Sequence, residues 1–299
     1  MALLIITTIL WAFSFSLIGE YLAGHVDSYF SVLMRVGLAA LVFLPFLRTR
    51  GQTLTTILLY MLVGAMQLGI MYLFSFRAYL YLSVSEFLLF TVLTPLYITL
   101  IYDLLSKRRL RWGYALSALL AVVGAAIIRY DKVSDHFWTG LMFVQLANLS
   151  FAIGMVGYKR LMETRPMPQH NAFAWFYLGA AIVAVIAWFL LGNPQKLPTT
   201  SLQWGILVWL GVVASGLGYF MWNYGATQVD AGTLGIMNNV HVPAGLLVNL
   251  AIWQEQPHWP SFIIGGTVIL ASLWVHRRWV APRSAQMADG RTRGSSLSE

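Results

Sequence analysis

The stretch from Leu234 to Trp253 reads LGIMNNVHVPAGLLVNLAIW and has the length and apolar character of a membrane-spanning helix. Near its middle it carries Asn238, His241 and Pro243. Because a bilayer core offers no water, each polar group there needs a protein partner or a filled cavity. Pro243 also removes one helix hydrogen bond and frees a backbone carbonyl. We therefore interpret this stretch as part of a substrate site at mid-membrane depth, with bonding to neighbouring helices as the alternative.

The rest of the chain is similarly apolar. Of its 299 residues, 59% are hydrophobic and 10% are charged, whereas about a quarter of the residues in soluble domains are charged. Apolar runs of helix length recur throughout, which predicts an all-α polytopic membrane protein. The first run has no basic segment before it, so we expect a retained helix rather than a signal peptide. We expect ten transmembrane helices, at 2–23, 28–47, 54–77, 84–104, 112–128, 137–158, 172–191, 202–224, 231–253 and 259–275.

The basic residues indicate orientation. The net charge is +8, but Lys and Arg lie at the ends of apolar runs, so we expect them to set topology and not to bind nucleic acid. With the N-terminus inside, fourteen of the 19 Lys and Arg residues fall on the cytoplasmic side and three on the opposite side. This asymmetry predicts that both termini are cytoplasmic. We expect residues 277–299 to form a polar, disordered cytoplasmic tail.

The two halves of the chain resemble each other. A shift of 148 residues aligns Pro95 with Pro243, and we expect each proline to break its helix. The sequence WAFSFSLIGE at 11–20 also resembles FAIGMVGYKR at 151–160. Five helices per half, an odd number, would give the halves opposite orientations in the membrane. We therefore predict two inverted five-helix repeats, residues 1–130 and 131–276, with chance similarity between apolar helices as the alternative.

These features resemble the EamA branch of the drug/metabolite transporter superfamily, which has ten helices in two halves and a proline in the fourth and ninth. The short link between the third and fourth helices is YLYLSVSE at 79–86. The second half carries WQEQPHWPSFIIGG at 253–266, with Glu255 where the family has an acidic turn, whereas SKRRLRW at 106–112 lacks an acid. The whole chain also resembles the biotin-transporting members of the carboxylate/amino acid/amine transporter group. This resemblance implies biotin uptake across a bacterial inner membrane, with export of amino acids, drugs or other metabolites as the alternative.

Several charged residues lie within or beside the spans. The 148-residue shift sets the face that carries Asn238 and His241 opposite the face of the fourth span that carries Glu86 and Tyr97. A stabilising charge at the start of a helix is the alternative role for Glu86. Arg77 is our candidate for capturing an anionic substrate, with a salt bridge or snorkelling as the alternative. We rank Arg35, the second intramembrane arginine, below it.

The remaining candidates follow from the chemistry of biotin. Its ureido ring needs neutral donors and acceptors, its thiophane ring and chain need apolar or aromatic walls, and its carboxylate needs a cation or donors. Many amphipathic metabolites would fit the same list, and bonding between helices is the alternative for each residue. The predicted substrate contacts are Asn238, His241, Asn148, Asn223, Arg77, Glu86, Trp11, Trp222 and Tyr97.

An intramembrane enzyme is the rival from another functional class. The sequence contains no HExxH or GxSxG motif and no acidic metal cluster. It also contains no cysteine, which excludes disulfides and thiol nucleophiles. We therefore expect no catalytic residue, metal or cofactor. The expected partners are the lipid bilayer and a small carboxylate substrate, and the sequence leaves open whether two copies form a homodimer.

Overall fold

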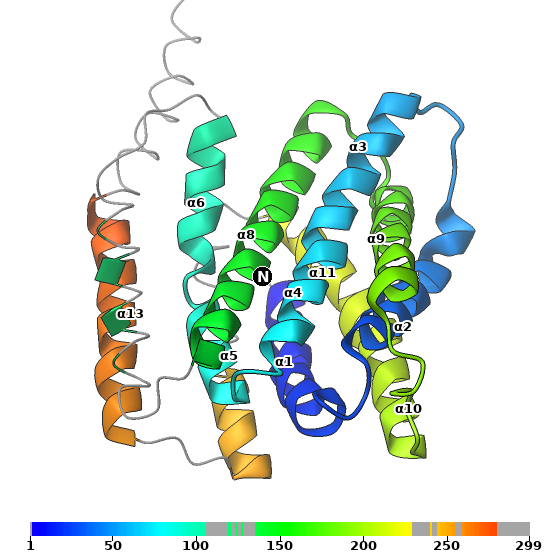
Figure 1. The fold of residues 1–299 in the computed structure, drawn as a ribbon. Coiled ribbons are helices and arrows are strands. Elements are labelled where there is room, and N and C mark those ends of the chain that lie inside the picture. Colours follow the sequence, from blue (N-terminus) through cyan, green and yellow to red (C-terminus); the bar gives the residue numbers. More distant parts are fainter. Residues whose placement is uncertain are drawn as a thin grey trace, which may run out of the picture.

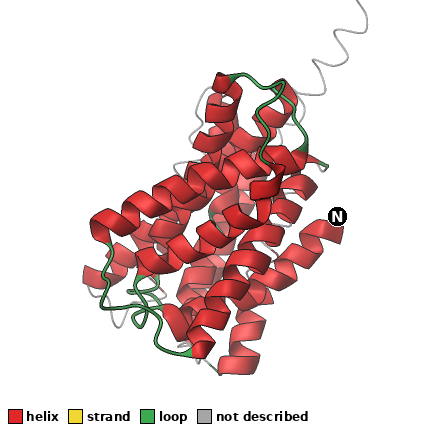
Figure 2. Ribbon diagram, turned by 90° about the vertical axis from the view of Figure 1, so that its right-hand side faces the viewer, coloured by secondary structure: helices red, strands yellow, loops and turns green. Residues whose placement is uncertain are grey.

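The computed structural model describes residues 2–105, 116, 119–120, 123–124, 127, 135–228, 240, 244–254 and 259–279. Every regular element in these ranges is a helix (Figure 2). The prediction of an all-helical, multi-pass membrane protein is confirmed, because seven of the described helices are long and apolar enough to cross a membrane. These are Ala2–Leu22, Ser28–Phe46, Leu54–Ala78, Val84–Tyr102, His136–Thr164, Gln169–Leu191 and Ser201–Thr227.

The seven helices correspond to the first four expected spans and to the sixth, seventh and eighth. Most of the fifth and ninth spans, with Asn238, His241 and Pro243, lies outside the described residues. The tenth span is α13, Trp259–Trp279, which continues past its expected end at 275. It therefore includes residues 277–279, which we had assigned to the tail. The rest of the tail also lies outside the described part of the chain.

Three of the seven long spans contain π-helical segments (η1, η3 and η5) within or at the end of an α-helix, and a further one, η6 (Asn249–Trp253), ends the described part of the ninth span. A π turn shifts the hydrogen-bond register and is often found at functional sites. The three composite spans are α1 (Ala2–Leu17) with η1 (Ile18–Leu22); α3 (Leu54–Gly64), η3 (Ala65–Ile70) and α4 (Met71–Ala78); and α10 (Ser201–Trp209), η5 (Leu210–Leu217) and α11 (Gly218–Thr227).

The fourth span is interrupted near its middle. It consists of α5 (Val84–Thr91) and α6 (Thr94–Leu105), separated by residues 92–93. Pro95 is the second residue of α6, a position where a missing backbone N–H costs no helix hydrogen bond. The Thr94 hydroxyl donates to the Thr91 carbonyl over 2.6 Å, so a side chain satisfies a backbone acceptor at the interruption.

The helices form a bundle with loops at its two ends (Figures 1 and 2). The long helix α8 (Asp135–Thr164) packs against α4 and α6, whereas α9 (Gln169–Leu191) packs against α3 and α2 (Ser28–Phe43). In addition, α2 packs against η5, so segments far apart in the sequence lie side by side in the interior.

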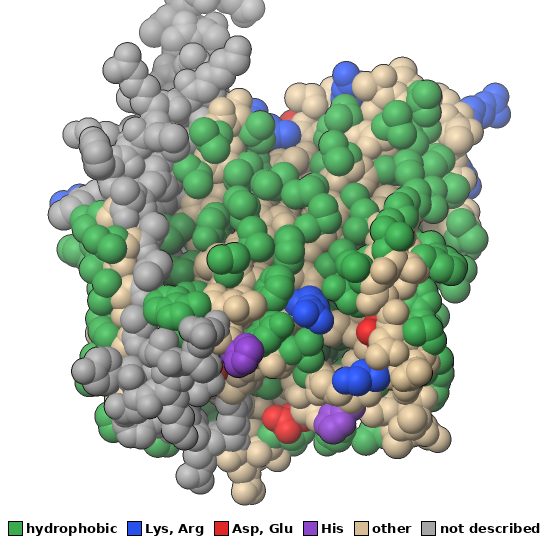
Figure 3. All heavy atoms as spheres, in the orientation of Figure 1, with side chains coloured by type: hydrophobic (Ala, Val, Ile, Leu, Met, Phe, Trp, Pro, Cys, Tyr) green, Lys and Arg blue, Asp and Glu red, His purple; other side chains and the backbone are tan. Residues whose placement is uncertain are grey.

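The face shown in Figure 3 is mostly hydrophobic, with Lys and Arg side chains toward its upper edge and in its lower part. Many large apolar side chains are exposed on the bundle surface; Phe189, for example, is 80% exposed. Such a surface is suited to contact with lipid tails.

Candidate substrate-binding site

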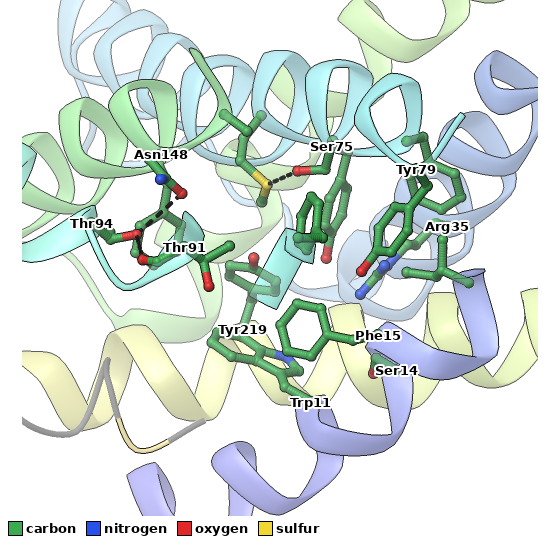
Figure 4. Close-up of a pocket in the computed structure, with 17 residues that line it drawn as sticks. Trp11, Ser14, Phe15, Arg35, Ser75, Tyr79, Thr91, Thr94, Asn148 and Tyr219 are labelled. Atoms are coloured by element: carbon green, nitrogen blue, oxygen red, sulfur yellow. Dashed lines mark hydrogen bonds between the residues drawn. The ribbon is translucent and has the colours of Figure 1, made fainter. Parts of the chain in front are cut away.

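A cavity lies inside the bundle, where spans from both halves of the chain meet (Figure 4). It encloses about 680 Å³ of space between atoms, a figure that includes open solvent at its mouth. Its wall is formed by α1, η1, α2, α4, α5, α6, α8 and α11, and by Tyr79 just after α4. The lining residues are Trp11, Ser14, Phe15, Ile18, Arg35, Met71, Tyr72, Ser75, Phe76, Tyr79, Phe87, Thr91, Thr94, Ala147, Asn148, Phe151 and Tyr219.

Arg35 is the one charged side chain among these described lining residues. It lies midway along α2 and is 4% exposed. Its Nε atom donates to the Ser215 hydroxyl over 2.6 Å, and its guanidinium carbon lies 4.1 Å from the centroid of the Tyr72 ring. No carboxylate in the described part of the chain forms an ion pair with it. Both described partners are neutral, so no described residue compensates the positive charge, and an uncompensated charge is costly in a membrane interior.

The position of Arg35 depends on both halves of the chain. Ser215 belongs to η5, and its hydroxyl lies 2.8 Å from the Tyr72 hydroxyl of α4. The hydroxyl of Tyr177, on α9, donates to the backbone carbonyls of Ser215 and Gly216 in η5, over 2.6 and 2.9 Å. The π-helical segment is therefore held by hydrogen bonds from α2, α4 and α9, and Ser215 provides an acceptor for the guanidinium group.

Aromatic rings form the middle of the cavity wall. The rings of Trp11 and Tyr219 lie 4.5 Å apart between centroids, and Tyr219 meets Tyr72 edge to face at 5.9 Å. Phe87 stacks on Tyr79 at 4.3 Å. The indole nitrogen of Trp11 donates to the Ala214 carbonyl over 2.9 Å, which fixes the ring. Such walls favour a flat or aliphatic ligand body because they bury apolar surface without strong directional demands.

Amide and hydroxyl groups form the opposite end of the cavity. Asn148 is 4% exposed. Its Nδ2 atom donates to the Phe90 carbonyl over 3.0 Å and to the Gln145 Oε1 atom over 3.3 Å. The Thr94 hydroxyl lies 3.2 Å from Asn148 Oδ1. Figure 4 shows Asn148, Thr91 and Thr94 on one side of the view, and Arg35 and Tyr79 on the other.

Of the residues predicted from the sequence, Trp11 and Asn148 line the cavity. Arg77 does not; it is partly exposed at the end of α4, where its guanidinium lies 3.5 Å from the Tyr81 hydroxyl. Glu86 also lies outside the lining. It forms a reciprocal capping box with Ser83 at the start of α5, in agreement with its alternative role at a helix terminus.

Three further candidates lie elsewhere in the bundle. Asn223 is fully buried and exchanges two hydrogen bonds with Gln67, over 3.0 and 3.2 Å. Trp222 packs on Trp11, with 5.0 Å between ring centroids, and does not itself line the cavity. Tyr97 donates to Gln145 over 3.2 Å. Gln145 also accepts from Asn148, which lines the cavity, whereas Tyr97 does not. Asn238 and His241 lie outside the described residues.

From the sequence we ranked Arg77 above Arg35 as the anion-binding candidate, but in the structure Arg35 lines the cavity and Arg77 does not. A charge in the middle of an apolar run is a candidate functional residue by default, whereas a charge at the end of a run reaches the interface readily. Arg35 had this signal and Arg77 did not. Thr91, Thr94 and Ser75 carried no comparable signal, because single hydroxyl residues commonly bond to their own helix.

Comparisons with known proteins agree on the family. The family model described as "EamA-like transporter family" matches residues 1–130 and 138–277. A protein of Escherichia coli (strain K12) named "Biotin transporter" is 84% identical over 299 residues, which is all of both chains. A Pseudomonas aeruginosa protein named "Probable biotin transporter" is 55% identical over 279 residues, covering 93% of this chain and 97% of the relative.

A solved structure described as "Crystal structure of protein" matches the fold with a TM-score of 0.63. The two chains are 20% identical, and the match covers 92% of this chain and 95% of the other, so it bears on the fold alone. The resemblance inferred from the helix pattern and the prolines is confirmed by the family match, which extends over nearly the whole chain. This chain therefore belongs to the EamA-like transporter family.

Proposed function

We propose that this protein is a secondary transporter that takes up biotin across the bacterial inner membrane through the central cavity. The observation that carries the proposal is the composition of the cavity wall, which combines a guanidinium without a described carboxylate partner, aromatic rings and a cluster of amide and hydroxyl groups. Biotin has a carboxylate, an apolar ring and chain, and a ureido group. The names of the relatives that are 84% and 55% identical support the same substrate.

We further propose that the chain consists of ten membrane helices in two inverted repeats, residues 1–130 and 131–276. Reciprocal contacts between the halves support this symmetry. A side chain at Gly64 would collide with the Phe176 carbonyl, and a Cβ at Gly211, one residue off the 148-residue shift, would lie 3.3 Å from the Arg35 carbonyl. A similar pair of close contacts, one from each half, recurs further along these helices: Gly69 with Ala180, and Gly216 with Ala39.

The same proposal places both termini in the cytoplasm, on the basis of the distribution of Lys and Arg. A reporter enzyme that is active only in the cytoplasm should be active when fused after Glu299. Activity of a periplasm-specific reporter at that position would contradict this orientation.

Uptake of labelled biotin tests the function. We expect vesicles that contain only this purified protein to accumulate biotin above protein-free vesicles, and unlabelled biotin to compete. Vesicles of known orientation distinguish import from export: with the periplasmic side outward, an importer should accumulate biotin, whereas an exporter should accumulate it only with the cytoplasmic side outward. Failure of biotin to enter or leave vesicles of either orientation would refute the proposed substrate.

A further inference from the structure

The two ends of the cavity differ in hydrogen-bonding capacity. At one end, Arg35 brings donors and a positive charge, and its described partners are a hydroxyl and an aromatic ring. At the other end, the polar groups are Asn148, Thr91 and Thr94. What each end can bind depends on which of its hydrogen atoms and lone pairs are already used.

The donors of Asn148, Thr91 and Thr94 are taken by the protein. The Phe90 carbonyl can only accept, so the atom that faces it must be Nδ2 of Asn148, and the second hydrogen of that group faces Gln145 Oε1. The Thr91 hydroxyl donates to the Leu88 carbonyl over 2.6 Å. The Thr94 hydroxyl donates to the Thr91 carbonyl at the same distance.

What remains at this end is acceptor capacity. Asn148 Oδ1 and the two threonine hydroxyl oxygens each keep lone pairs after these bonds are made. A ligand that carries N–H groups can donate to them. A carboxylate, which only accepts, would meet oxygen atoms without free hydrogens and would lose its hydration there.

We infer that the cavity binds its substrate in one orientation, with a carboxylate on Arg35 and a neutral N–H-bearing ring against Asn148, Thr91 and Thr94. The ureido ring of biotin is such a group, so the inference rests on the proposed function and adds the polarity of binding. Ser215 and Tyr72 act as positioning residues, because they hold the guanidinium in place. Arg35, not Arg77, is the anion-binding residue.

Equilibrium binding to the purified protein tests the orientation. The ligands are biotin, biotinamide, which lacks the negative charge, and a biotin analogue methylated on both ureido nitrogens. Hydrogen bonds to charged groups contribute more binding free energy than neutral ones. We therefore expect the parent protein to bind biotin about tenfold to a hundredfold more tightly than biotinamide. We expect a smaller preference, about threefold to tenfold, for biotin over the methylated analogue, because neutral hydrogen bonds contribute less.

Each variant should remove one preference and keep the other. In Arg35→Gln the preference for biotin over biotinamide should fall to within about threefold, while biotinamide affinity and the preference over the methylated analogue persist. Thr91→Val and Asn148→Leu should lose the preference for biotin over the methylated analogue and keep the preference for biotin over biotinamide. Arg35→Lys should keep a preference for the acid because the charge remains. Arg77→Gln is the matched control and should keep both preferences.

The outcomes separate this inference from the proposed function. Equal binding of biotin and biotinamide by the parent protein overturns the inference even if Arg35→Gln does not fold. Persistence of the parent's acid preference in Arg35→Gln overturns it as well. Lipoate and lipoamide form a second acid–amide pair. If lipoate binds in an Arg35-dependent manner and biotin does not, biotin is the wrong substrate and the anion site stands. If no acid binds, both fail.

Discussion

Two buried polar regions of the bundle differ in how their hydrogen-bonding groups are paired: a closed region, formed by Gln67 and Asn223, and the cavity that contains Arg35 and Asn148. Gln67 and Asn223 are fully buried and pair with each other through two amide hydrogen bonds. Gly154 of α8 packs against this pair so closely that a Cβ there would lie 2.6 Å from the Cα atom of Gln67. Arg35 and Asn148, in contrast, face a cavity: no described carboxylate pairs with the Arg35 guanidinium, and Asn148 Oδ1 has acceptor capacity beyond its contact with Thr94.

The comparison shows that a polar residue type in a membrane helix does not by itself identify a site. Tyr219 and Asn223 lie one helical turn apart on α11, yet Tyr219 lines the cavity and Asn223 pairs with Gln67. A polar group that is fully paired within the protein stabilises the contact between helices. One with unused capacity next to a cavity can bind a substrate. Substitutions in the closed region should therefore change stability, and those in the cavity should change affinity.

The largest expected effect is the insertion of a side chain into the closed region. Gly154→Leu would collide with the backbone of Gln67, and overpacking of this kind costs about 1–3 kcal/mol, or more where backbone must move. We expect a sharp loss of membrane abundance and of apparent melting temperature. Gly37→Leu is the matched control, because a Cβ added at Gly37 would have no described atom within 4 Å beyond its own helix backbone and chain neighbours. Equal stability of the two variants would contradict the close approach.

Removal of one partner of the amide pair should have an intermediate effect on stability. Asn223→Leu leaves the Gln67 amide unpaired at a cost of about 1–2 kcal/mol. The double variant with Gln67→Leu should recover part of this loss, because no polar group is then left unpaired. Thermal unfolding and biotin binding, measured on the same samples, check the prediction. A loss of biotin affinity above tenfold in the stable double variant would place this pair in the site.

The predicted contact at Asn238 offers a test outside the described residues. A lost neutral hydrogen bond costs about 0.5–1.5 kcal/mol. Asn238→Leu should therefore raise the apparent substrate constant by roughly threefold to tenfold at matched membrane abundance. Transport like that of the parent would remove Asn238 from the proposed contacts, without affecting the assignments of Arg35 and Asn148.

The smallest expected effect distinguishes two neighbouring tryptophans. Trp11→Phe loses the indole hydrogen bond to the Ala214 carbonyl and should destabilise the protein by about 1 kcal/mol. Trp222→Phe removes an indole N–H that has no hydrogen-bond partner among the described residues, so this part of the cost is absent. We expect Trp11→Phe alone to weaken biotin binding measurably, since only Trp11 lines the cavity. Binding that weakens equally in both would contradict this distinction.

Much of the fold could be predicted from the sequence, because membrane helices are long apolar runs bounded by polar loops. Six of the seven described spans lie within a few residues of their expected positions; the seventh, α8, is longer than expected. The capping role of Glu86 also had a signal, since Ser83 and Glu86 form the S-x-x-E pattern that begins a helix. The ten-helix count and the inverted arrangement stay predictions.

The site was harder to predict. Sequence spacing shows which residues share a helix face, but not which neighbouring helix that face meets. The π segments η3 and η5 also shift faces along the third and eighth spans, and nothing in the sequence marked them. For these reasons Asn223 was predicted as a substrate contact although Gln67 is its partner in the structure, and the order of Arg35 and Arg77 was reversed.

Protection of a single introduced thiol most directly tests whether biotin occupies the cavity. The chain has no cysteine, so Ser75→Cys places one thiol on the cavity wall and Thr199→Cys places one on an exposed loop. We predict that saturating biotin slows labelling at position 75 about tenfold or more, since occupancy at a hundred times the dissociation constant leaves about 1% of sites free. Labelling at position 199 should not change. Unchanged labelling at position 75 in protein that still binds biotin would contradict the account.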